Sequence, residues 1–221
     1  MKRILISLLI ISLGMVQLKG QEINTSVEKV YVVFKTHLDV GFTDLSSVVT
    51  QRYITEFIPK ALDVSEKLRA ENASEKYVWT TGAWLIWKYL HTASPKEVER
   101  LEAAIRRGDI VWNSVPYTVE SESMNRDLFE TCLLLSHKLD EKYGKKTIAA
   151  KMTDVPGHTR SIVAPMSRAG IRFLHIGVNP ACPIPGVPEF CRWRDTDGRS
   201  CIAISSSAIS LNEEAIRRAF G

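Results

Sequence analysis

The sequence predicts an α/β fold built around a parallel sheet. Short segments rich in β-branched and aromatic residues alternate with longer segments of helical periodicity along most of the chain. This alternation has the pace of βαβ units, which place neighbouring strands in parallel. With 221 residues, of which 45% are hydrophobic and 24% charged, the chain can bury the core of one domain. The pattern leaves open whether the sheet is open or closed into a barrel.

The first residues have the pattern of a secretory signal peptide. Lys2 and Arg3 precede an apolar stretch from Ile4 to about Leu13, which is too short for a membrane-spanning helix. A membrane anchor is the alternative interpretation. We therefore expect residues 1–20 to be a leader and residues 21–221 to be a secreted or periplasmic region without a stable membrane anchor.

The charge of the chain argues against a nucleic-acid partner. Residues 1–20 contain three basic and no acidic residues, so the formal charge of +4 falls to +1 without them. The remaining sequence has no run of Lys and Arg interleaved with aromatic residues. A basic surface for RNA or DNA is therefore not expected.

Five parallel strands are expected, each a short apolar run bounded by turn residues. They lie at residues 29–37, 76–81, 109–115, 147–154 and 171–178. Two further short strands around Asp-Thr-Asp-Gly-Arg are expected within residues 190–205, in the pattern of a hairpin.

Helices are expected between these strands. Ser94, Pro95 and Glu97 form a capping-box pattern, and Gly108 ends the helix that they begin. A break is expected near Pro59, because proline cannot donate the helical hydrogen bond. The helical ranges are 47–70, 83–93, 95–108, 126–144 and 161–170, with another beginning at residue 211. Since that last helix has no C-cap before Gly221, we expect the chain to be the N-terminal part of a longer domain.

The four cysteines lack the spacing of a zinc knuckle. In an oxidising compartment, Cys182 and Cys191 could form a disulfide across a proline-rich loop. Cys132 lies in an apolar helical stretch and is expected to be a core thiol.

The stretch "VYVVFKTHLDVGF" ends a strand with an imidazole and a carboxylate. Residues i and i+2 of a strand point to the same face, so His37 and Asp39 should project together at the C-terminal end. These side chains are suitable ligands for zinc. By itself, His-x-Asp is a weak pattern.

A second carboxylate, Asp154, ends the strand "TIAAKMTD" and is followed by Gly157 and His158 in a turn. Carboxyl ends of parallel strands meet at one edge of a sheet, so Asp154 should lie near His37 and Asp39. A carboxylate at this place can bind a metal, attack an electrophile or cap the next helix. His158 is expected to hold the turn by hydrogen bonding.

Together, "HLDVGF" at 37–42 and "DVPGH" at 154–158 resemble two motifs of glycoside hydrolase family 38, the α-mannosidases. In that family one strand ends in His-x-Asp-Pro-Gly-Trp and a later strand ends in Asp-Pro-Phe-Gly-His. The resemblance extends over most of residues 29–180. Each motif is moderately specific, and their order and spacing strengthen the match.

The resemblance implies a seven-stranded β/α barrel, of which this chain holds the N-terminal part, with one bound zinc ion. His37 and Asp39 match zinc ligands, and Asp154 matches the residue that is both ligand and catalytic nucleophile. The implied reaction is hydrolysis of an α-mannoside or related glycan with retention, through a covalent glycosyl-aspartate. The acid/base group and the last zinc ligand of the family have no match in this sequence.

Two positions depart from the family pattern. Phe42 stands in place of tryptophan, and Pro156 stands in place of phenylalanine. Phe42 is expected to contact substrate, and Glu122, after the third strand, is a weaker candidate for the same role. Because both changed positions line the sugar subsite in the family, they leave the identity of the sugar open.

Two other functions remain as alternatives. A polysaccharide deacetylase also uses His and Asp to bind a metal, but the His-x-x-x-His pair of those enzymes does not occur in this sequence. A secreted carbohydrate-binding protein that keeps the barrel without catalysis is the second alternative. It predicts zinc or sugar binding without turnover.

Overall fold

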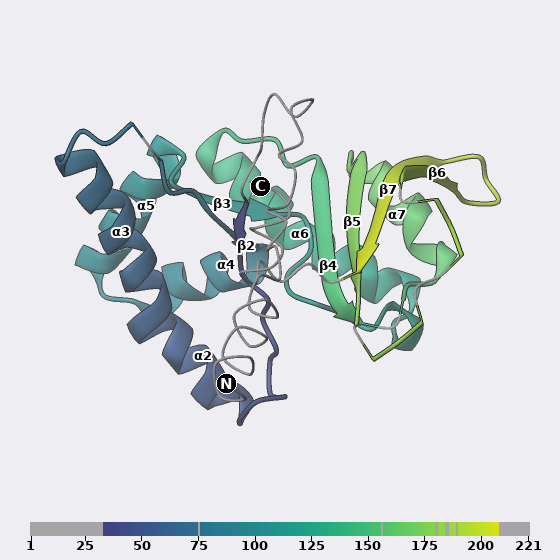
Figure 1. Ribbon diagram of the computed structural model, residues 1–221, viewed down its shortest axis with the longest axis horizontal. Helices are drawn as coiled ribbons and strands as arrows, with labels where there is room; N and C mark the ends of the chain where they lie inside the picture. Colours follow the sequence, from purple (N-terminus) through teal and green to yellow (C-terminus); the bar gives the residue numbers. More distant parts are fainter. Residues whose placement is uncertain are drawn as a thin grey trace, which may run out of the picture. The chain divides into compact units, whose positions relative to one another are not determined.

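The described part of the chain consists of parallel strands with helices packed against them (Figure 1). The computed structural model describes residues 33–207, except residues 75, 156, 180, 184–185 and 189. The expected leader, Pro156 and the helix expected from residue 211 lie outside the described residues. Within the described part, no helix is long and apolar enough to cross a membrane.

Six of the strands are parallel to their neighbours. One sheet has the order β1-β2-β3, and the other has the order β4-β5-β7-β6, with only the β6–β7 pair antiparallel. The strands are β1 (Phe34–Lys35), β2 (Trp79–Gly82), β3 (Ile110–Asn113), β4 (Ala149–Val155), β5 (Phe173–Val178), β6 (Phe190–Arg194) and β7 (Ser200–Ser207). The predicted α/β class, the strand order along the chain and the hairpin are therefore confirmed.

A closed barrel is not seen among the described residues. The Ser114 N–H donates to the Ala149 carbonyl at 2.9 Å, which joins the end of β3 to the start of β4. No described strand joins β1 to the other sheet, so the sheets stay open. Of the first strand expected at residues 29–37, residues 29–32 lie outside the described part, and within that part Phe34 and Lys35 pair with β2.

The helical range expected at 47–70 is one nearly continuous helix. It consists of α2 (Ser46–Arg52), a π-helical turn η1 (Tyr53–Phe57) and α3 (Ile58–Ala70). Pro59 cannot donate to the carbonyl four residues earlier, and its ring crowds that carbonyl. The wider π turn before Pro59 accommodates the conflict, so the expected break is a change of helical pitch.

The remaining helices follow the sequence expectations closely. Ser94 and Glu97 form both hydrogen bonds of the capping box, and Gly108 and Gly144 adopt left-handed conformations after the helices that they end. The helices are α4 (Ala83–Thr92), α5 (Pro95–Arg107), α6 (Arg126–Tyr143) and α7 (Val163–Arg168), with 3-10 turns η2 (Ser121–Ser123) and η3 (Arg160–Ile162).

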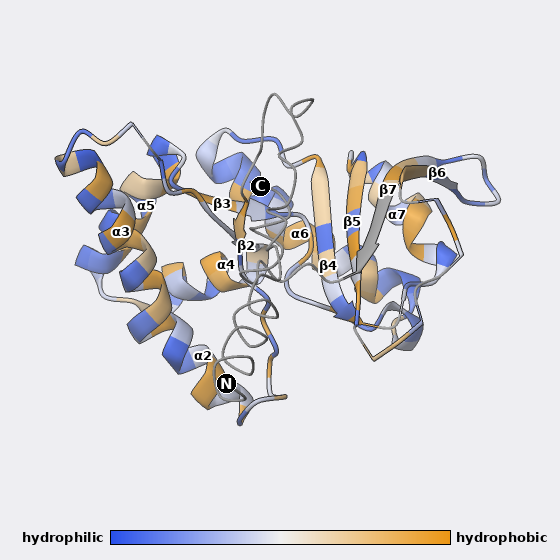
Figure 2. Cartoon of the chain, viewed as in Figure 1, coloured by the Kyte–Doolittle hydropathy of each residue, from blue (hydrophilic) through white to orange (hydrophobic). Residues whose placement is uncertain are grey.

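The helices cover one face of the sheets, and buried apolar side chains of the strands pack against them; Figure 2 shows apolar residues on both helices and strands. Trp79 and Trp112 pack into the core beside α4 and α5, and Met152 and Leu174 pack into a second core. We call the opposite face, which carries Lys35, Thr80, Lys151, Thr153 and His175, the inner face. It positions the candidate site.

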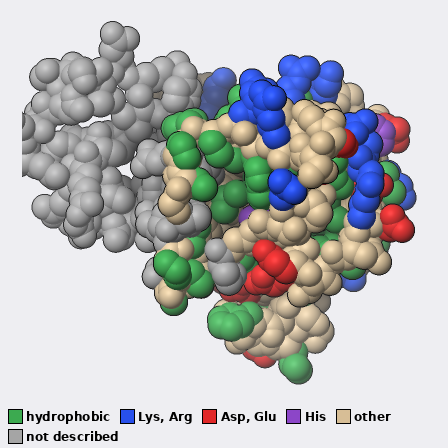
Figure 3. All heavy atoms as spheres, turned by 90° about the vertical axis from the view of Figure 1, so that its right-hand side faces the viewer, with side chains coloured by type: hydrophobic (Ala, Val, Ile, Leu, Met, Phe, Trp, Pro, Cys, Tyr) green, Lys and Arg blue, Asp and Glu red, His purple; other side chains and the backbone are tan. Residues whose placement is uncertain are grey.

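The β6–β7 hairpin carries exposed basic side chains. Arg192, Arg194 and Arg199 are exposed, and Figure 3 shows Lys and Arg side chains along the edges of the end that carries this hairpin. Trp193 points to the other side and packs against the second core. Cys182 and Cys191 are free thiols, so the disulfide is not present in this structure.

Candidate active site

His37 and Asp39 leave the sheet immediately after β1. The His37 Nε2 atom lies 2.9 Å from Asp39 Oδ1, and both side chains are about 30% exposed. The pair is therefore directed to the same side, as the two-residue spacing predicts. The Tyr53 hydroxyl, from the π turn, donates to the His37 carbonyl at 3.1 Å and fixes this segment.

Asp154 is placed by a bulge in β4. Its φ of 70° lies in the left-handed region, and the pairing of β4 with β5 shifts register between Thr153 and Val155. A non-glycine residue in this conformation costs about 1–3 kcal/mol, which the surrounding structure must offset. Such a bulge redirects a side chain next to a functional site. The alternative that Asp154 caps a helix is wrong, because Thr159 caps η3.

The two predicted carboxylate ligands both approach the Nε2 atom of the third predicted ligand, His37. Asp154 Oδ2 lies 3.4 Å from His37 Nε2, the same atom that Asp39 approaches at 2.9 Å. Donor atoms of a tetrahedral zinc site, each 2.0–2.1 Å from the metal, are roughly 3.3 Å apart. The distance from His37 Nε2 to Asp154 Oδ2 fits this value. The shorter distance from His37 Nε2 to Asp39 Oδ1 is that of a direct hydrogen bond.

The donor types fit zinc, and the positions of the donors fit only in part. In the described ranges, no group of three or more His, Cys, Asp or Glu side chains is arranged so that it could hold a metal ion as it stands. Asp39 would have to move by roughly 0.4 Å from His37 to reach the separation of tetrahedral ligands. We therefore keep zinc binding as a proposal.

Three residues at this site were not predicted from the sequence. The Asn179 amide, just after β5, donates to Asp154 Oδ1 at 2.9 Å. Thr153 Oγ1 lies 3.4 Å from His37 Nδ1 and accepts from Lys151 Nζ at 3.0 Å. Tyr53 is the third. A polar residue directly after the fifth strand could have indicated Asn179, because it stands at the same sheet edge.

The two predicted substrate contacts lie on exposed segments. Phe42 is 87% exposed on the loop that follows Asp39. Glu122 is exposed on η2 and lies near enough to His158 to raise the pKa of that imidazole by its charge. Their contact with substrate stays a prediction.

His158 anchors the segment after β4 to η2, as expected of a residue that holds the turn. Its Nδ1 lies 3.2 Å from Ser121 Oγ, which also accepts from the Thr159 N–H at 3.1 Å. Its Nε2 is buried without a hydrogen-bond partner among the described residues. Burial lowers the pKa of His158 to about 4, and the charge of Glu122 opposes this only weakly.

The protein should lose stability in acid through this histidine. Because its folded pKa is lower than that of an unfolded histidine, the unfolded state binds more protons between about pH 6.5 and 4. Stability is complete above that window and falls as the pH decreases through it, by roughly 1–2 kcal/mol between pH 7 and 5. Denaturant titrations of His158→Gln should show a smaller loss of unfolding free energy between pH 7 and 5. The exposed His137→Gln variant should match the natural protein, and an unchanged loss in His158→Gln would contradict the assignment.

A surface hollow beside α3 does not belong to this site. It has a volume of about 270 Å³ and is lined by residues including Ser65, Arg69 and Asp109. Asp109 precedes β3, so this hollow lies at the N-terminal edge of the strands, opposite His37 and Asp154.

Comparison of the fold with solved structures finds carbohydrate-active enzymes. An α-mannosidase from Enterococcus faecalis V583 superimposes with a TM-score of 0.64 at 17% identity, over 83% of this chain and 21% of that chain. A 4-α-glucanotransferase from Thermococcus litoralis superimposes with a TM-score of 0.56 at 12% identity, over 84% and 28%. The chain thus spans less than a third of either structure.

The sequence itself matches no family model, and no curated protein sequence matches it. At these low identities the structural likeness shows the fold alone. The described part of the chain therefore has an α/β fold similar to the corresponding portion of glycoside-active enzymes.

Proposed function

We propose that this chain is the N-terminal part of a zinc-dependent retaining glycoside hydrolase that acts on α-mannosides or related glycans. The observation that carries the proposal is the convergence of Asp39 and Asp154 on His37 Nε2 at the C-terminal ends of β1 and β4. The solved structures with a similar fold, an α-mannosidase and a glucanotransferase, support the same class of substrate. We also propose that residues 1–20 direct the protein out of the cytoplasm.

His37, Asp39 and Asp154 would hold the zinc ion. The resemblance to family 38 implies that a zinc ion at this place holds sugar hydroxyls and helps to distort the ring. Thr153 would then accept a hydrogen bond from His37 Nδ1–H, which fixes the tautomer that leaves Nε2 free to bind metal. Asn179 would orient Asp154 through Oδ1.

The proposed reaction has two displacements. A carboxylate oxygen of Asp154 attacks the anomeric carbon, the glycosidic carbon–oxygen bond breaks, and the leaving oxygen takes a proton from an acid group elsewhere in the protein. The same acid group, now deprotonated, then takes a proton from water, whose oxygen attacks the anomeric carbon of the glycosyl ester and releases Asp154 as a carboxylate. We expect the acid/base carboxyl further along the chain than the matched motifs.

The experiment that tests this function is hydrolysis of an aryl α-mannoside by the natural full-length protein, together with its zinc content. We expect turnover that stops after chelation and returns with added zinc. Stoichiometric zinc without turnover on mannosides would exclude this substrate and favour a binding protein. Metal-free protein that gains no activity with zinc would contradict the proposed site.

Thr153 is expected to act as a positioning residue for His37. Thr153→Val keeps the side-chain shape but removes the contacts with His37 Nδ1 and Lys151 Nζ. Loss of such a partner to a metal ligand lowers metal affinity by about 10-fold or more. Zinc titration by calorimetry should show this decrease. Thr80→Val, which changes the inner face on β2, serves as the control and should bind zinc as the natural protein does.

A further inference from the structure

Asn72 and Ser74 form the pattern Asn-Ala-Ser directly after α3. An asparagine, any residue except proline, and then serine or threonine is the acceptor pattern for an N-linked oligosaccharide. The sequence matches this pattern once more, at Asn24-Thr-Ser, which lies outside the described residues. Every other asparagine of the chain lacks a serine or threonine two places later. Asn72 is therefore the described position where this modification is to be considered.

Asn72 follows the end of α3 in a left-handed conformation. Its φ is 52°, and its N–H donates to the Arg69 carbonyl at 3.1 Å, while the Ala73 N–H donates to the Leu68 carbonyl at 2.9 Å. Asparagine adopts this conformation more readily than most residues, so the end of the helix alone accounts for an asparagine at this place. It does not account for the hydroxyl group of Ser74, which is the second requirement of the acceptor pattern.

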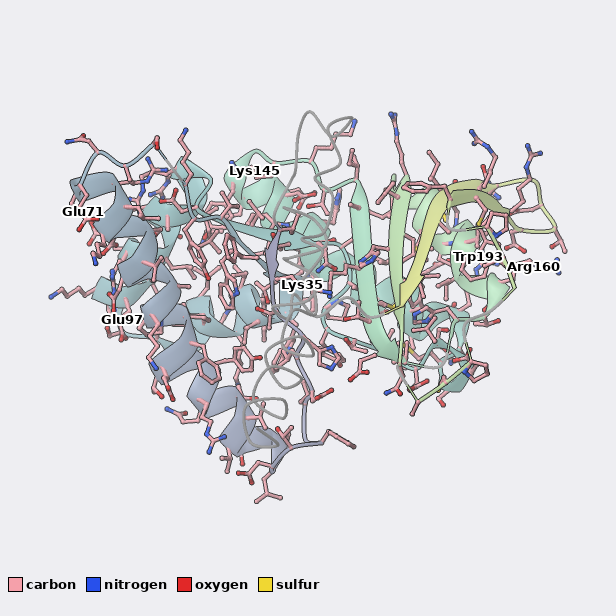
Figure 4. The ribbon with its side chains drawn as sticks, viewed as in Figure 1. Lys35, Glu71, Glu97, Lys145, Arg160 and Trp193 are labelled. Atoms are coloured by element: carbon pink, nitrogen blue, oxygen red, sulfur yellow. The ribbon has the colours of Figure 1, made fainter. Side chains whose placement is uncertain are left out.

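The acceptor segment is open to solvent. Asn72 and Ser74 are both exposed, and neither side chain forms a hydrogen bond with another residue of the described part. Figure 4 labels Glu71, the residue before Asn72, at the outer end of α3. The described residues between Asn72 and β2 belong to no helix or strand. A transferase can therefore reach the Asn72 amide and the Ser74 hydroxyl without unfolding a regular element.

The hollow beside α3 gives an attached sugar a place to lie. Its volume is about 270 Å³, and Asn72 is part of its wall together with Tyr77, Lys76 and Arg69. An aromatic ring next to the attachment point offers a surface to the apolar face of a sugar, and the long basic side chains offer hydrogen-bond donors to its hydroxyl groups. The surroundings of Asn72 therefore accommodate an oligosaccharide.

We propose that Asn72 carries an N-linked oligosaccharide. This inference rests on the proposed export of the chain and not on the proposed zinc site. The donor is an oligosaccharide linked to a polyprenyl diphosphate. The Asn72 amide nitrogen forms a bond to the anomeric carbon and loses one proton, while the bond from that carbon to the diphosphate oxygen breaks and the lipid diphosphate leaves with the electron pair. No oxidant or reductant takes part.

An oligosaccharide on Asn72 leaves the candidate active site open. Asp109, which is also part of the wall of the hollow, directly precedes β3, so the hollow lies at the N-terminal edge of the strands. His37 and Asp154 lie at the opposite edge. Modification of Asn72 and catalysis at the candidate site are therefore tested by separate measurements.

The test is peptide mapping by mass spectrometry of the natural full-length protein, exported by its own cells and treated with a peptide N-glycosidase in water enriched in heavy oxygen. We expect Asn72 to become an aspartate that carries heavy oxygen, because this enzyme hydrolyses the glycosylated amide. Mapping separates Asn72 from Asn24. An exported protein with unmodified Asn72 overturns the proposal. A chain that stays in the cytoplasm with residues 1–20 uncleaved overturns the proposed export and this proposal together.

Three variants made in the same cells assign the modification to the acceptor pattern. Asn72→Gly removes the amide and suits the left-handed conformation, so the protein should fold and lose the oligosaccharide at this position. Ser74→Ala should lose it as well, whereas Ser74→Thr keeps the hydroxyl group and should retain it. Since Ser74 is exposed, neither change should affect folding. Equal modification of Ser74→Ala and Ser74→Thr overturns the proposal. Zinc content and mannoside hydrolysis of the natural protein report separately on the proposed function.

Discussion

Asp154→Asn should reduce kcat on an aryl α-mannoside by at least about 1,000-fold, since an amide cannot form the glycosyl ester. The strand bulge already holds the side chain toward His37, with Asn179 on the other carboxylate oxygen. The near-isosteric amide keeps the size of the side chain, so the expected loss is chemical. Steady-state rates and circular dichroism spectra of the two proteins test this directly.

The control for Asp154→Asn is Asp197→Asn, which changes an exposed carboxylate in the β6–β7 turn and should leave kcat unchanged. Asp154→Ala is a second variant, which tests whether an added nucleophile can replace the carboxylate. Azide can occupy the place of the missing carboxylate and attack the anomeric carbon, so added azide should restore turnover and yield a glycosyl azide of inverted configuration. Full activity in Asp154→Asn would remove Asp154 from the mechanism.

Gly82→Ala should be the most destabilising single change among those considered, by at least about 3 kcal/mol. Gly82 ends β2 and precedes α4, and a Cβ atom there would lie 2.1 Å from the Pro116 carbonyl oxygen. That carbonyl and the Val115 carbonyl accept from the first N–H groups of α4, at 3.3 and 3.1 Å. The added methyl group must therefore displace the backbone that caps the helix. Urea denaturation measures the loss.

Gly157→Ala is the matched control for Gly82→Ala. A Cβ atom at Gly157 meets no other atom within 4 Å, and its backbone is outside the left-handed region. We expect Gly157→Ala to change the free energy of unfolding by less than about 1 kcal/mol. Equal effects of the two changes would contradict the close packing of Gly82 against the loop after β3.

Local signals in the sequence determine much of the fold. Both ends of α5 are formed by residues within one turn of the helix. The Ser94–Glu97 capping box pairs backbone N–H groups at its start, where Pro95 needs none, and Gly108 pairs backbone carbonyls at its end. The strand order and the β6–β7 hairpin likewise follow from short apolar runs and the turn between them. Contacts between near neighbours in sequence are sufficient for these features, which is why they could be predicted.

The sequence also determined part of the candidate site. His37 and Asp39 lie together because alternation along an extended chain places i and i+2 on one side. The proximity of Asp154 to His37 and Asp39 followed from the rule that the carboxyl ends of parallel strands lie at one edge of a sheet. The identity of the bound metal and of the sugar is carried only by the family resemblance and stays a prediction.

The tertiary structure alone decided the features that depend on residues far apart in sequence. The left-handed conformation of Asp154 comes from its register with β5, and Asn179 reaches it from 25 residues away. His37 Nδ1 lies 3.4 Å from Thr153 Oγ1, which is 116 residues further along the chain. Local propensity cannot predict such arrangements, because non-local pairing and burial determine where these polar side chains meet.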